Sequence, residues 1–189
     1  DEKKQIIDKA GLLEFVKPDD SIDDVGGLGA LCNWLEAKNR IFQKLDDALK
    51  MGLDTPRGVL ILGVPGCGKS MTAKATASLF QKPLVRLDVG RLLGKYIGES
   101  ESNMRDALKQ AEAISPCVLW IDEIEKAFAG GSEHAHEVTV RLIGQFLTWM
   151  QEKKSTVFVV ATANNIETLP PEFLRKGRFD EIFSVDLPD

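Results

Sequence analysis

Short runs of apolar residues alternate along the chain with longer segments in which apolar residues recur every three or four positions. The runs are typical of buried strands, and they lie at 59–62, 83–89, 117–121, 157–161 and 182–187. Helical spacing marks the segments 29–50, 100–115 and 138–150, and the alanine-rich segment 71–80, which has no Gly or Pro, is also expected to be helical. The alternation predicts an α/β fold, a doubly wound and mainly parallel five-stranded sheet with helices on both faces. In such a sheet, a site is expected at the carboxyl ends of the strands.

The N-terminal segment differs from the rest of the chain. Residues 1–17 place six apolar residues among charged ones, and we expect an amphipathic helix that breaks or ends near Gly11. A polar loop follows, so we expect an N-terminal helical extension over 1–21 and a single α/β domain over 22–189. The first residue is not Met and Asp189 directly follows a strand-like run, so we expect an excised fragment.

The chain is organised around a glycine-containing loop between the first apolar run and a helix. Residues 63–70, GVPGCGKS, match the pattern G-x-x-x-x-G-K-[ST] of phosphate-binding loops. Gly66 and Gly68 allow the loop to curl, and the N–H groups of a helix N-terminus attract phosphate. Lys69 offers a positive charge to the β- and γ-phosphates, and the Ser70 hydroxyl can bind Mg²⁺. The alternative is a glycine-rich turn that binds nothing.

This match predicts a binding site for ATP and Mg²⁺. The predicted nucleotide contacts in this stretch are Val64, Pro65, Gly66, Cys67, Gly68, Lys69, Ser70 and Met71.

Two adjacent acids follow the apolar run 117–121, at the sheet edge where the phosphate loop is expected. Asp122 is suited to holding Mg²⁺, and Glu123 is suited to orienting and polarising the water that attacks the γ-phosphate. Acids at the start of a solvated helix are the alternative, because they interact favourably with the helix dipole. The phosphate loop favours the catalytic interpretation.

Composition and charge narrow the classes of function. An apolar fraction of 43%, a charged fraction of 28% and a net charge of −5 are typical of a soluble globular protein without general attraction to nucleic acid or anionic membranes. No run is long enough for a membrane span, and three cysteines without a C-x-x-C pair suit a reducing, cytoplasmic compartment. An H-x-H pair, His134 and His136, allows either a metal site or a solvated loop.

From Ile22 onward the chain resembles the AAA family of ATPases. The segment DVGGL at 24–28 is similar to the family's entry segment, which implies that Val25 and Gly26 contact the nucleotide. Asn164 matches the sensor asparagine, so the resemblance implies a hydrogen bond to the γ-phosphate or the attacking water. The segment LRKGRFD at 174–180 is similar to the arginine-finger segment, so Arg175 and Arg178 would reach a neighbouring subunit's nucleotide. Surface arginines that only aid solubility are the alternative.

A second loop resembles the family's central-pore loop. In KYIGESE, at 95–101, the resemblance implies that Tyr96 and Ile97 project toward a protein substrate in a homo-oligomeric ring, expected to be a hexamer. An aromatic ring suits this role because it can pack against many side chains without demanding a sequence. A loop tyrosine packed on its own domain is the alternative reading of Tyr96.

Within the family, the segments VLWIDEIEKAF, FLTWMQEKKS and LPPEFLRKGRFDEIF resemble the Ycf-type AAA proteins of bacteria and algal plastids. That resemblance implies the bacterial cytoplasm or the plastid stroma as the location. Two departures affect coupling between subunits: MQE at 150–152 replaces an Asp-Gly-Phe signal, and Val140 replaces the first of two arginines and leaves Arg141. The family's helical lid is expected to be absent, so the fragment is expected to be monomeric, with low activity.

Two functions follow from these motifs. The first is an ATP-driven ring that remodels or translocates a protein partner, and the second is a nucleotide-dependent scaffold or assembly factor with slow turnover. No N-K-x-D guanine-reading motif occurs, which argues against a GTPase. A small-molecule kinase would not explain Asn164 or the GRFD segment.

Overall fold

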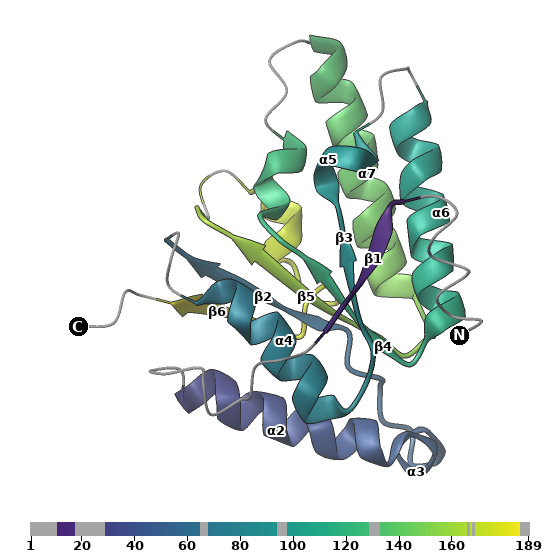
Figure 1. Ribbon diagram of the computed structural model, residues 1–189, viewed down its shortest axis with the longest axis vertical. Helices are drawn as coiled ribbons and strands as arrows, with labels where there is room; N and C mark the ends of the chain where they lie inside the picture. Colours follow the sequence, from purple (N-terminus) through teal and green to yellow (C-terminus); the bar gives the residue numbers. More distant parts are fainter. Residues whose placement is uncertain are drawn as a thin grey trace.

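The computed structural model describes residues 11–17, 29–64, 68–93, 98–128, 133–165, 167 and 169–185. They form a six-stranded sheet in the order β1-β3-β4-β5-β2-β6, in which every pair except β1 and β3 is parallel (Figure 1). The strands are β1 Leu13–Val16, β2 Gly58–Gly63, β3 Leu84–Leu87, β4 Cys117–Ile121, β5 Val157–Ala163 and β6 Glu181–Val185. The predicted α/β, mainly parallel sheet is confirmed, with six strands in place of five.

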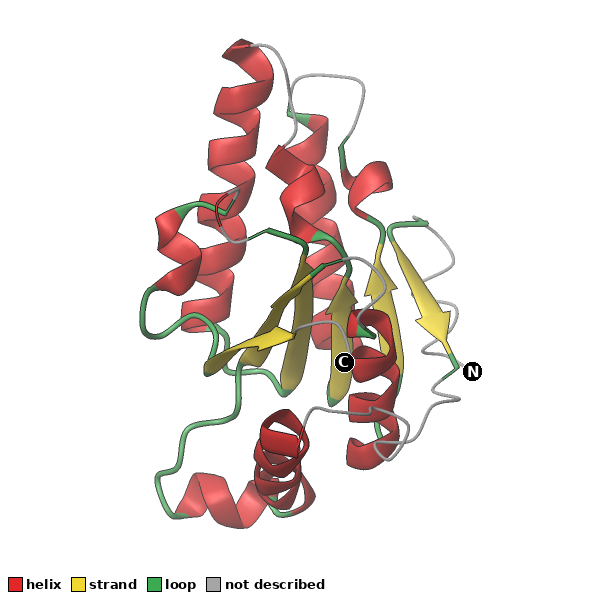
Figure 2. Cartoon of the chain, turned by 90° about the vertical axis from the view of Figure 1, so that its left-hand side faces the viewer, coloured by secondary structure: helices red, strands yellow, loops and turns green. Residues whose placement is uncertain are grey.

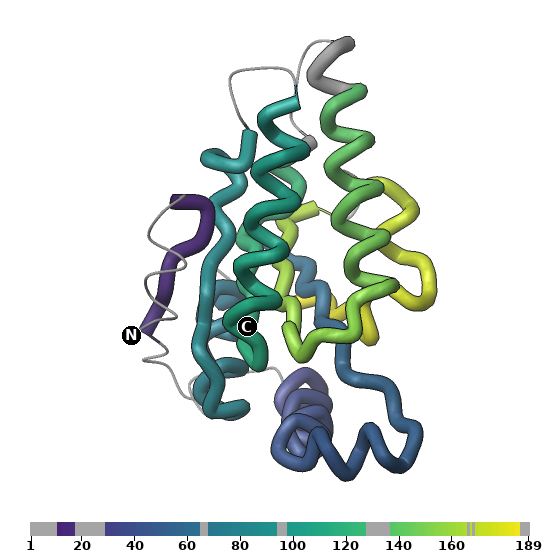
Figure 3. The backbone as a smooth tube through the Cα atoms, turned by 90° about the vertical axis from the view of Figure 1, so that its right-hand side faces the viewer, coloured from purple at the N-terminus to yellow at the C-terminus, as the bar shows by residue number. Residues whose placement is uncertain are grey.

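Helices cover both faces of this sheet (Figure 2). They are α2 Gly29–Gln43, α3 Leu45–Lys50, α4 Lys69–Phe80, α5 Val89–Leu92, α6 Glu99–Ile114 and α7 Glu133–Glu152, with 3₁₀ helices η2 Ile124–Phe128 and η4 Pro171–Leu174. Helices α2 and α4 share one apolar core with the sheet, and α5, α6 and α7 share the other. Figure 3 shows α6 and α7 running side by side on their face. Among the described helices, none combines the length and apolar character needed to cross a membrane.

The N-terminal prediction was wrong for residues 13–16, which form a strand rather than part of a helix. Strand β1 pairs antiparallel with β3, from Leu13 opposite Leu87 to Val16 opposite Leu84. A free strand edge presents unpaired N–H and C=O groups, and pairing satisfies them. The rest of the predicted extension, residues 1–10, and the expected boundary near residue 21 lie outside the described residues.

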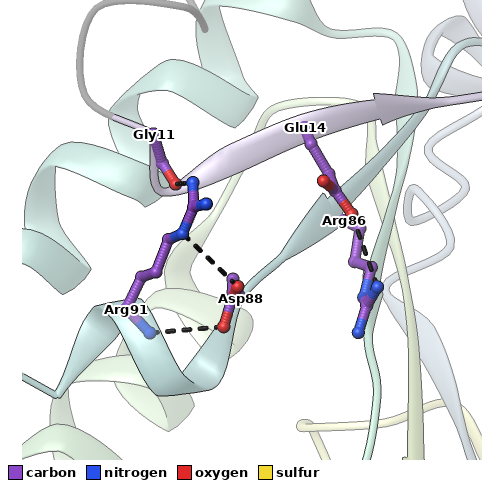
Figure 4. A network of polar contacts seen from close by, with 5 residues as sticks. All are labelled: Gly11, Glu14, Arg86, Asp88 and Arg91. Carbon is purple, nitrogen blue, oxygen red and sulfur yellow. Dashed lines mark hydrogen bonds and ion pairs between the residues drawn. The ribbon is translucent and has the colours of Figure 1, made fainter.

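Polar contacts fasten β1 to the sheet edge, as Figure 4 shows. Arg86 Nη1 lies 3.4 Å from Glu14 Oε1, and Arg91 Nη1 donates to the Gly11 carbonyl at 2.9 Å. Asp88 ends the strand that was predicted to reach residue 89, because its carboxylate accepts the Arg91 N–H at 3.2 Å and caps α5. The Glu14 carboxylate therefore belongs to an edge strand and not to the polar face of a helix.

Aromatic packing seats the helix that follows the phosphate loop. Phe158 of β5 is fully buried and contacts Phe80 of α4 with ring centroids 5.0 Å apart, and Phe42 of α2 at 5.8 Å. Phe42 and Phe80 stack on each other at 4.7 Å. Since aromatic pairs add directional contacts to area burial, this cluster fixes α4 relative to β5. The start of α4 is thereby placed against the carboxyl ends of the strands.

A lysine is partly buried behind the carboxyl end of α7. Lys153 Nζ lies 5.8 Å from the centroid of the Trp149 ring. Burial lowers the pKa of Lys153 from its ordinary value of 10.5 to about 8; nearby Arg57 adds to the decrease and Asp180 opposes it. The folded chain therefore stabilises the neutral form of this amine.

We predict that Lys153→Met raises the free energy of unfolding by roughly 1–3 kcal/mol near neutral pH, because it removes a poorly solvated charge. The unfolded chain keeps this proton up to about pH 10.5, whereas the folded chain releases it near 8. Between about pH 8 and pH 10.5, the free energy of unfolding of the wild type therefore rises, and the difference between the variant and the wild type becomes smaller. Urea unfolding at several pH values measures this difference in the free energy of unfolding, and Lys154→Met, at an exposed position, is the control. A pH-independent difference would contradict the prediction.

Candidate functional site

The carboxyl ends of the central strands and the start of α4 surround a cleft with a volume of about 340 Å³. Its lining residues are Gly68, Lys69, Ser70, Met71, Asp122, Glu123 and Asn164. These residues come from three separate stretches of the chain, the loop after β2, the turn after β4 and the end of β5. The sheet thus gathers the predicted phosphate loop, the paired acids and the sensor asparagine around one space.

Gly68 begins the cleft as the N-cap of α4. Its φ of 86° lies in the left-handed region, and an added Cβ would meet no atom within 4 Å. Glycine is therefore required here by backbone conformation and not by lack of room. Its carbonyl accepts the Thr72 N–H and hydroxyl, each at 3.3 Å, which closes the first turn. Lys69 and Ser70 thus stand in the first turn of α4, the end of a helix that attracts anions.

Lys69 is folded back onto the end of β2. Its side chain is buried, and Nζ donates to the carbonyls of Gly63 at 2.5 Å and Val64 at 2.8 Å. These neutral acceptors hold the ammonium group at the base of the loop. A phosphate in the cleft would compete with them for the same charge.

Thr162 joins the two acids after β4 to β5. Its hydroxyl donates to Asp122 Oδ1 at 2.6 Å and accepts the Glu123 N–H at 2.9 Å. Thr162 is fully buried, so both contacts are shielded from water. Glu123 has a φ of 50°, a left-handed conformation that costs about 1–3 kcal/mol for a residue other than glycine. The bond from its N–H to Thr162 helps to hold that conformation.

Two donors engage the Glu123 carboxylate. Asn164 Nδ2 donates to Oε1 at 3.3 Å, and Lys126 forms an ion pair with Oε2. The hydrogen bond from Lys126 is the largest cause that lowers the pKa of Glu123, and Asn164 and Lys69 add to the decrease, while partial burial opposes it. The same hydrogen bond raises the pKa of Lys126. Both groups are therefore charged at neutral pH.

Three contacts in this site were missed by the motif analysis: Thr162, Glu125 and Lys126. Glu125 Oε1 accepts the Asn164 backbone N–H at 3.0 Å and so positions the sensor asparagine. The available signal for Thr162 was its position as a hydroxyl residue near the end of β5, two residues before Asn164. Lys126 follows Glu123 by three residues, the spacing of neighbours on one side of a helical turn.

The two predicted finger arginines do not line this cleft. Arg175 follows η4 and is exposed, whereas Arg178 is half-buried. Phe179 is buried and anchors the segment in the core. Asp180 is a second anchor, since its Oδ2 accepts the backbone N–H groups of Arg57 at 2.6 Å and Gly58 at 2.9 Å. The end of the GRFD motif thus fastens this segment to the start of β2.

The altered inter-subunit signal lies at the end of α7. Met150 is fully buried, and Gln151 and Glu152 are exposed. Val140 is 53% exposed, and the arginine beside it, Arg141, lies 3.4 Å from Glu101 of α6.

Several predicted site residues lie outside the described part of the chain. They are Val25, Gly26, Pro65, Gly66, Cys67, Tyr96 and Ile97, together with the side chains of His134 and His136. Their roles stay predictions.

Comparison with known proteins identifies relatives of this chain. Residues 59–187 match the profile described as ATPase family associated with various cellular activities (AAA). The chain is 53% identical over 189 residues to the uncharacterized AAA domain-containing protein ycf46 of Guillardia theta, covering 100% of this chain and 37% of that protein. For the protein of the same name in Pyropia yezoensis, identity is 52% over 190 residues, covering 100% and 38%. The predicted resemblance to Ycf-type AAA proteins is confirmed.

More distant similarity extends to a protein of a land plant. The cell division control protein 48 homolog C of Arabidopsis thaliana is 34% identical over 176 residues, which cover 92% of this chain and 22% of that protein. The chain spans well under half of the length of each of these relatives.

We predict that Thr162→Val lowers the free energy of unfolding by about 1–3 kcal/mol, because valine keeps the shape but leaves the Glu123 N–H without its acceptor. Thr162→Ser retains the hydroxyl and should recover most of the loss. Thr76→Val is a matched control, since that buried hydroxyl donates only to a carbonyl of its own helix, Thr72 O, at 2.7 Å. Urea unfolding of the four proteins checks this, and equal effects at positions 162 and 76 would refute it.

Proposed function

Because the chain belongs to the AAA family of ATPases, we propose that it binds ATP with Mg²⁺ in the described cleft and hydrolyses the γ-phosphate. The observation that carries this proposal is the contact between Asn164 and Glu123 on the cleft that Lys69 also lines. The cleft therefore contains a carboxylate, an amide and an ammonium group, each from a residue that follows a different strand. Charge-rich sites of this kind suit phosphoryl transfer, in which positioning and electrostatic stabilisation supply most of the catalysis.

The first turn of α4 is proposed to receive the phosphates. The N–H groups that follow Gly68 and the positive end of the helix dipole attract anions. Lys69 would exchange its carbonyl partners for phosphate oxygens, which gain more from a positive charge than neutral carbonyls do. Exposed Met71, beside Ser70, adds apolar surface to the same cleft.

Ser70 and Asp122 are proposed to hold Mg²⁺. Both offer oxygen donors and both line the cleft, and Mg²⁺ is bound in nucleotide sites by one or two protein oxygens together with phosphates and water. The bond from the Thr162 hydroxyl uses Oδ1 of Asp122 and fixes the orientation of its carboxylate. When bound, the ion would neutralise phosphate charge during transfer.

Glu123 is proposed to orient the attacking water and to accept its proton. An ionised carboxylate is needed for this step, and the lowered pKa of Glu123 keeps it ionised at neutral pH. Asn164 would fix the direction of the Glu123 carboxylate through Oε1 and offer its amide to the water or the γ-phosphate. Glu125 supports this step by holding the Asn164 backbone.

At the level of the whole protein, we propose a homo-oligomeric ring, a hexamer, that acts on a protein partner. Arg175 is exposed and neither finger arginine lines the chain's own cleft, which fits a role at a neighbouring subunit's nucleotide. Tyr96 and Ile97 are proposed to contact the polypeptide, on the strength of the pore-loop resemblance.

A nucleotide-dependent scaffold with slow turnover is the second candidate. The ion pair between Lys126 and Glu123 favours it, because a cation on the proposed base makes the carboxylate a weaker proton acceptor. The replacement of the Asp-Gly-Phe signal by MQE at 150–152 agrees with weaker coupling between subunits. The two candidates differ in turnover, since a protein substrate should accelerate ATP hydrolysis only by a remodelling ring.

We predict that Lys69→Ala abolishes measurable ATP binding, whereas Glu123→Gln binds ATP with nearly wild-type affinity and loses at least about 100-fold in hydrolysis rate. The variants separate the charge that binds phosphate from the group that activates water. Titration calorimetry with Mg·ATP measures the first effect, and single-turnover phosphate release measures the second. A Glu123→Gln protein that hydrolyses ATP at the wild-type rate would remove Glu123 from the mechanism.

We predict that, in the whole protein, Arg178→Ala and Lys69→Ala subunits, each inactive alone, regain ATP hydrolysis when mixed. The Lys69→Ala subunit would supply Arg178 to the intact cleft of the other subunit, and an arginine finger is worth about 10³–10⁵ in rate. Recovery should increase with protein concentration, because the active site forms between subunits.

The matched control for this mixture replaces Lys69→Ala by a subunit that carries both substitutions, which should restore nothing. Recovery with that double variant, or full activity of Arg178→Ala alone at low concentration, would show that Arg178 does not act in trans.

A further inference from the structure

Lys126 forms an ion pair with Glu123, and the proposed mechanism of hydrolysis does not use it. We propose that Lys126 is a latch on Glu123: its ammonium group occupies Oε2, and hydrolysis proceeds only after the ammonium group leaves. This inference rests on the proposed function, because it assigns a regulation to the same carboxylate. Lys126 is thus a positioning residue, which acts through Glu123 and not on the reacting atoms.

The backbone builds the latch into the turn after β4. Lys126 N donates to the Glu123 carbonyl at 2.9 Å, which closes a 3₁₀ turn at the start of η2. Residues three apart lie on the same side of such a turn, so the lysine side chain meets the Glu123 carboxylate without any element having to move. The left-handed φ of 50° at Glu123 belongs to this turn.

Three acidic residues lie near Lys126, and each has a different hydrogen-bond or ion-pair partner. Asp122 accepts a hydrogen bond from Thr162, and Glu125 accepts the Asn164 N–H. Glu123 is the acid with which Lys126 forms its ion pair in the described structure. Oε1 of Glu123 is engaged by Asn164 and Oε2 by Lys126, so a water that approaches this carboxylate competes with a charged donor.

Exposure makes the latch reversible. The side chain of Lys126 is 65% exposed, whereas that of Glu123 is 29% exposed. The lysine can therefore turn into solvent while the carboxylate stays in the cleft. Ion pairs in contact with water are weak and are screened by salt, so opening the latch needs only a modest competing attraction. Phosphate charge in the cleft would supply such an attraction for the ammonium group.

The first experiment measures steady-state ATP hydrolysis of Lys126→Ala, Lys126→Arg and wild type at saturating Mg·ATP. Lys126→Ala should raise kcat about two- to fivefold with KM unchanged, and Lys126→Arg, which can keep the ion pair, should stay near wild type. Lys109→Ala, at an exposed position on α6, controls for loss of one surface charge. Added salt should raise kcat of wild type relative to that of Lys126→Ala, because it weakens the latch.

Each other outcome of this experiment overturns the latch. An unchanged kcat in Lys126→Ala would show that the ion pair has no effect on catalysis. A decreased kcat would instead assign Lys126 to substrate binding or transition-state stabilisation. Absence of Mg·ATP binding by calorimetry would overturn the latch together with the proposed function, so the two failures are distinguishable.

A second experiment tests the contact without requiring turnover. A zero-length carbodiimide should link Glu123 to Lys126 in protein without nucleotide, detected by mass spectrometry as loss of one water from a peptide containing both residues. Glu123→Gln should give no such product. A saturating non-hydrolysable ATP analogue with Mg²⁺ should reduce the yield of this cross-link by roughly a fifth to a half, the open fraction that a two- to fivefold gain in kcat implies. An undiminished yield with the analogue bound would show that the lysine does not leave, and would overturn the latch.

Discussion

Parallel pairing of β5 with both β4 and β2 is the constraint on which the site depends. Because these three strands run in the same direction and are hydrogen-bonded as neighbours, the residues that follow them meet at one edge. The phosphate loop and the paired acids are about fifty residues apart along the chain, so proximity in sequence does not bring them together. Burial of nearly all of β2, β4 and β5 between helices on both faces stabilises this arrangement.

The side-chain hydroxyl of one residue in β5 then fixes the orientation of the two acids that follow β4. Thr162 fixes the Asp122 carboxylate on one side and the Glu123 backbone on the other. A buried hydroxyl that satisfies both its donor and an acceptor position adds little net free energy, but removing it would leave partners unpaired. This asymmetry explains how a threonine without any chemistry of its own can determine where both acids point.

The central strands could be predicted well from the sequence, whereas the edge strand β1 and the side-chain contacts of the site could not. Continuous apolar runs predicted β2, β4 and β5 to within two residues, because a strand buried on both faces consists largely of apolar residues. Strand β1 has a mixed pattern that also suits a helix, and only the unpaired edge of β3 determines its structure. Similarly, the motif identified Glu123 by residue type, whereas its contacts with Asn164 and Lys126 depend on side-chain geometry.

Both charged groups assigned to catalysis already have partners within the chain. Lys69 donates to two carbonyls at the end of β2, and Glu123 contacts Lys126 and Asn164. Nucleotide binding would therefore exchange one set of polar contacts for another, and its net free energy would be smaller than the sum of the new contacts. Such an exchange links the two halves of the site, because the phosphate charge that draws Lys69 out of the loop also attracts Lys126 away from Glu123. A cleft built in this way can couple occupancy of the phosphate site to the freedom of the proposed base without any movement of the sheet.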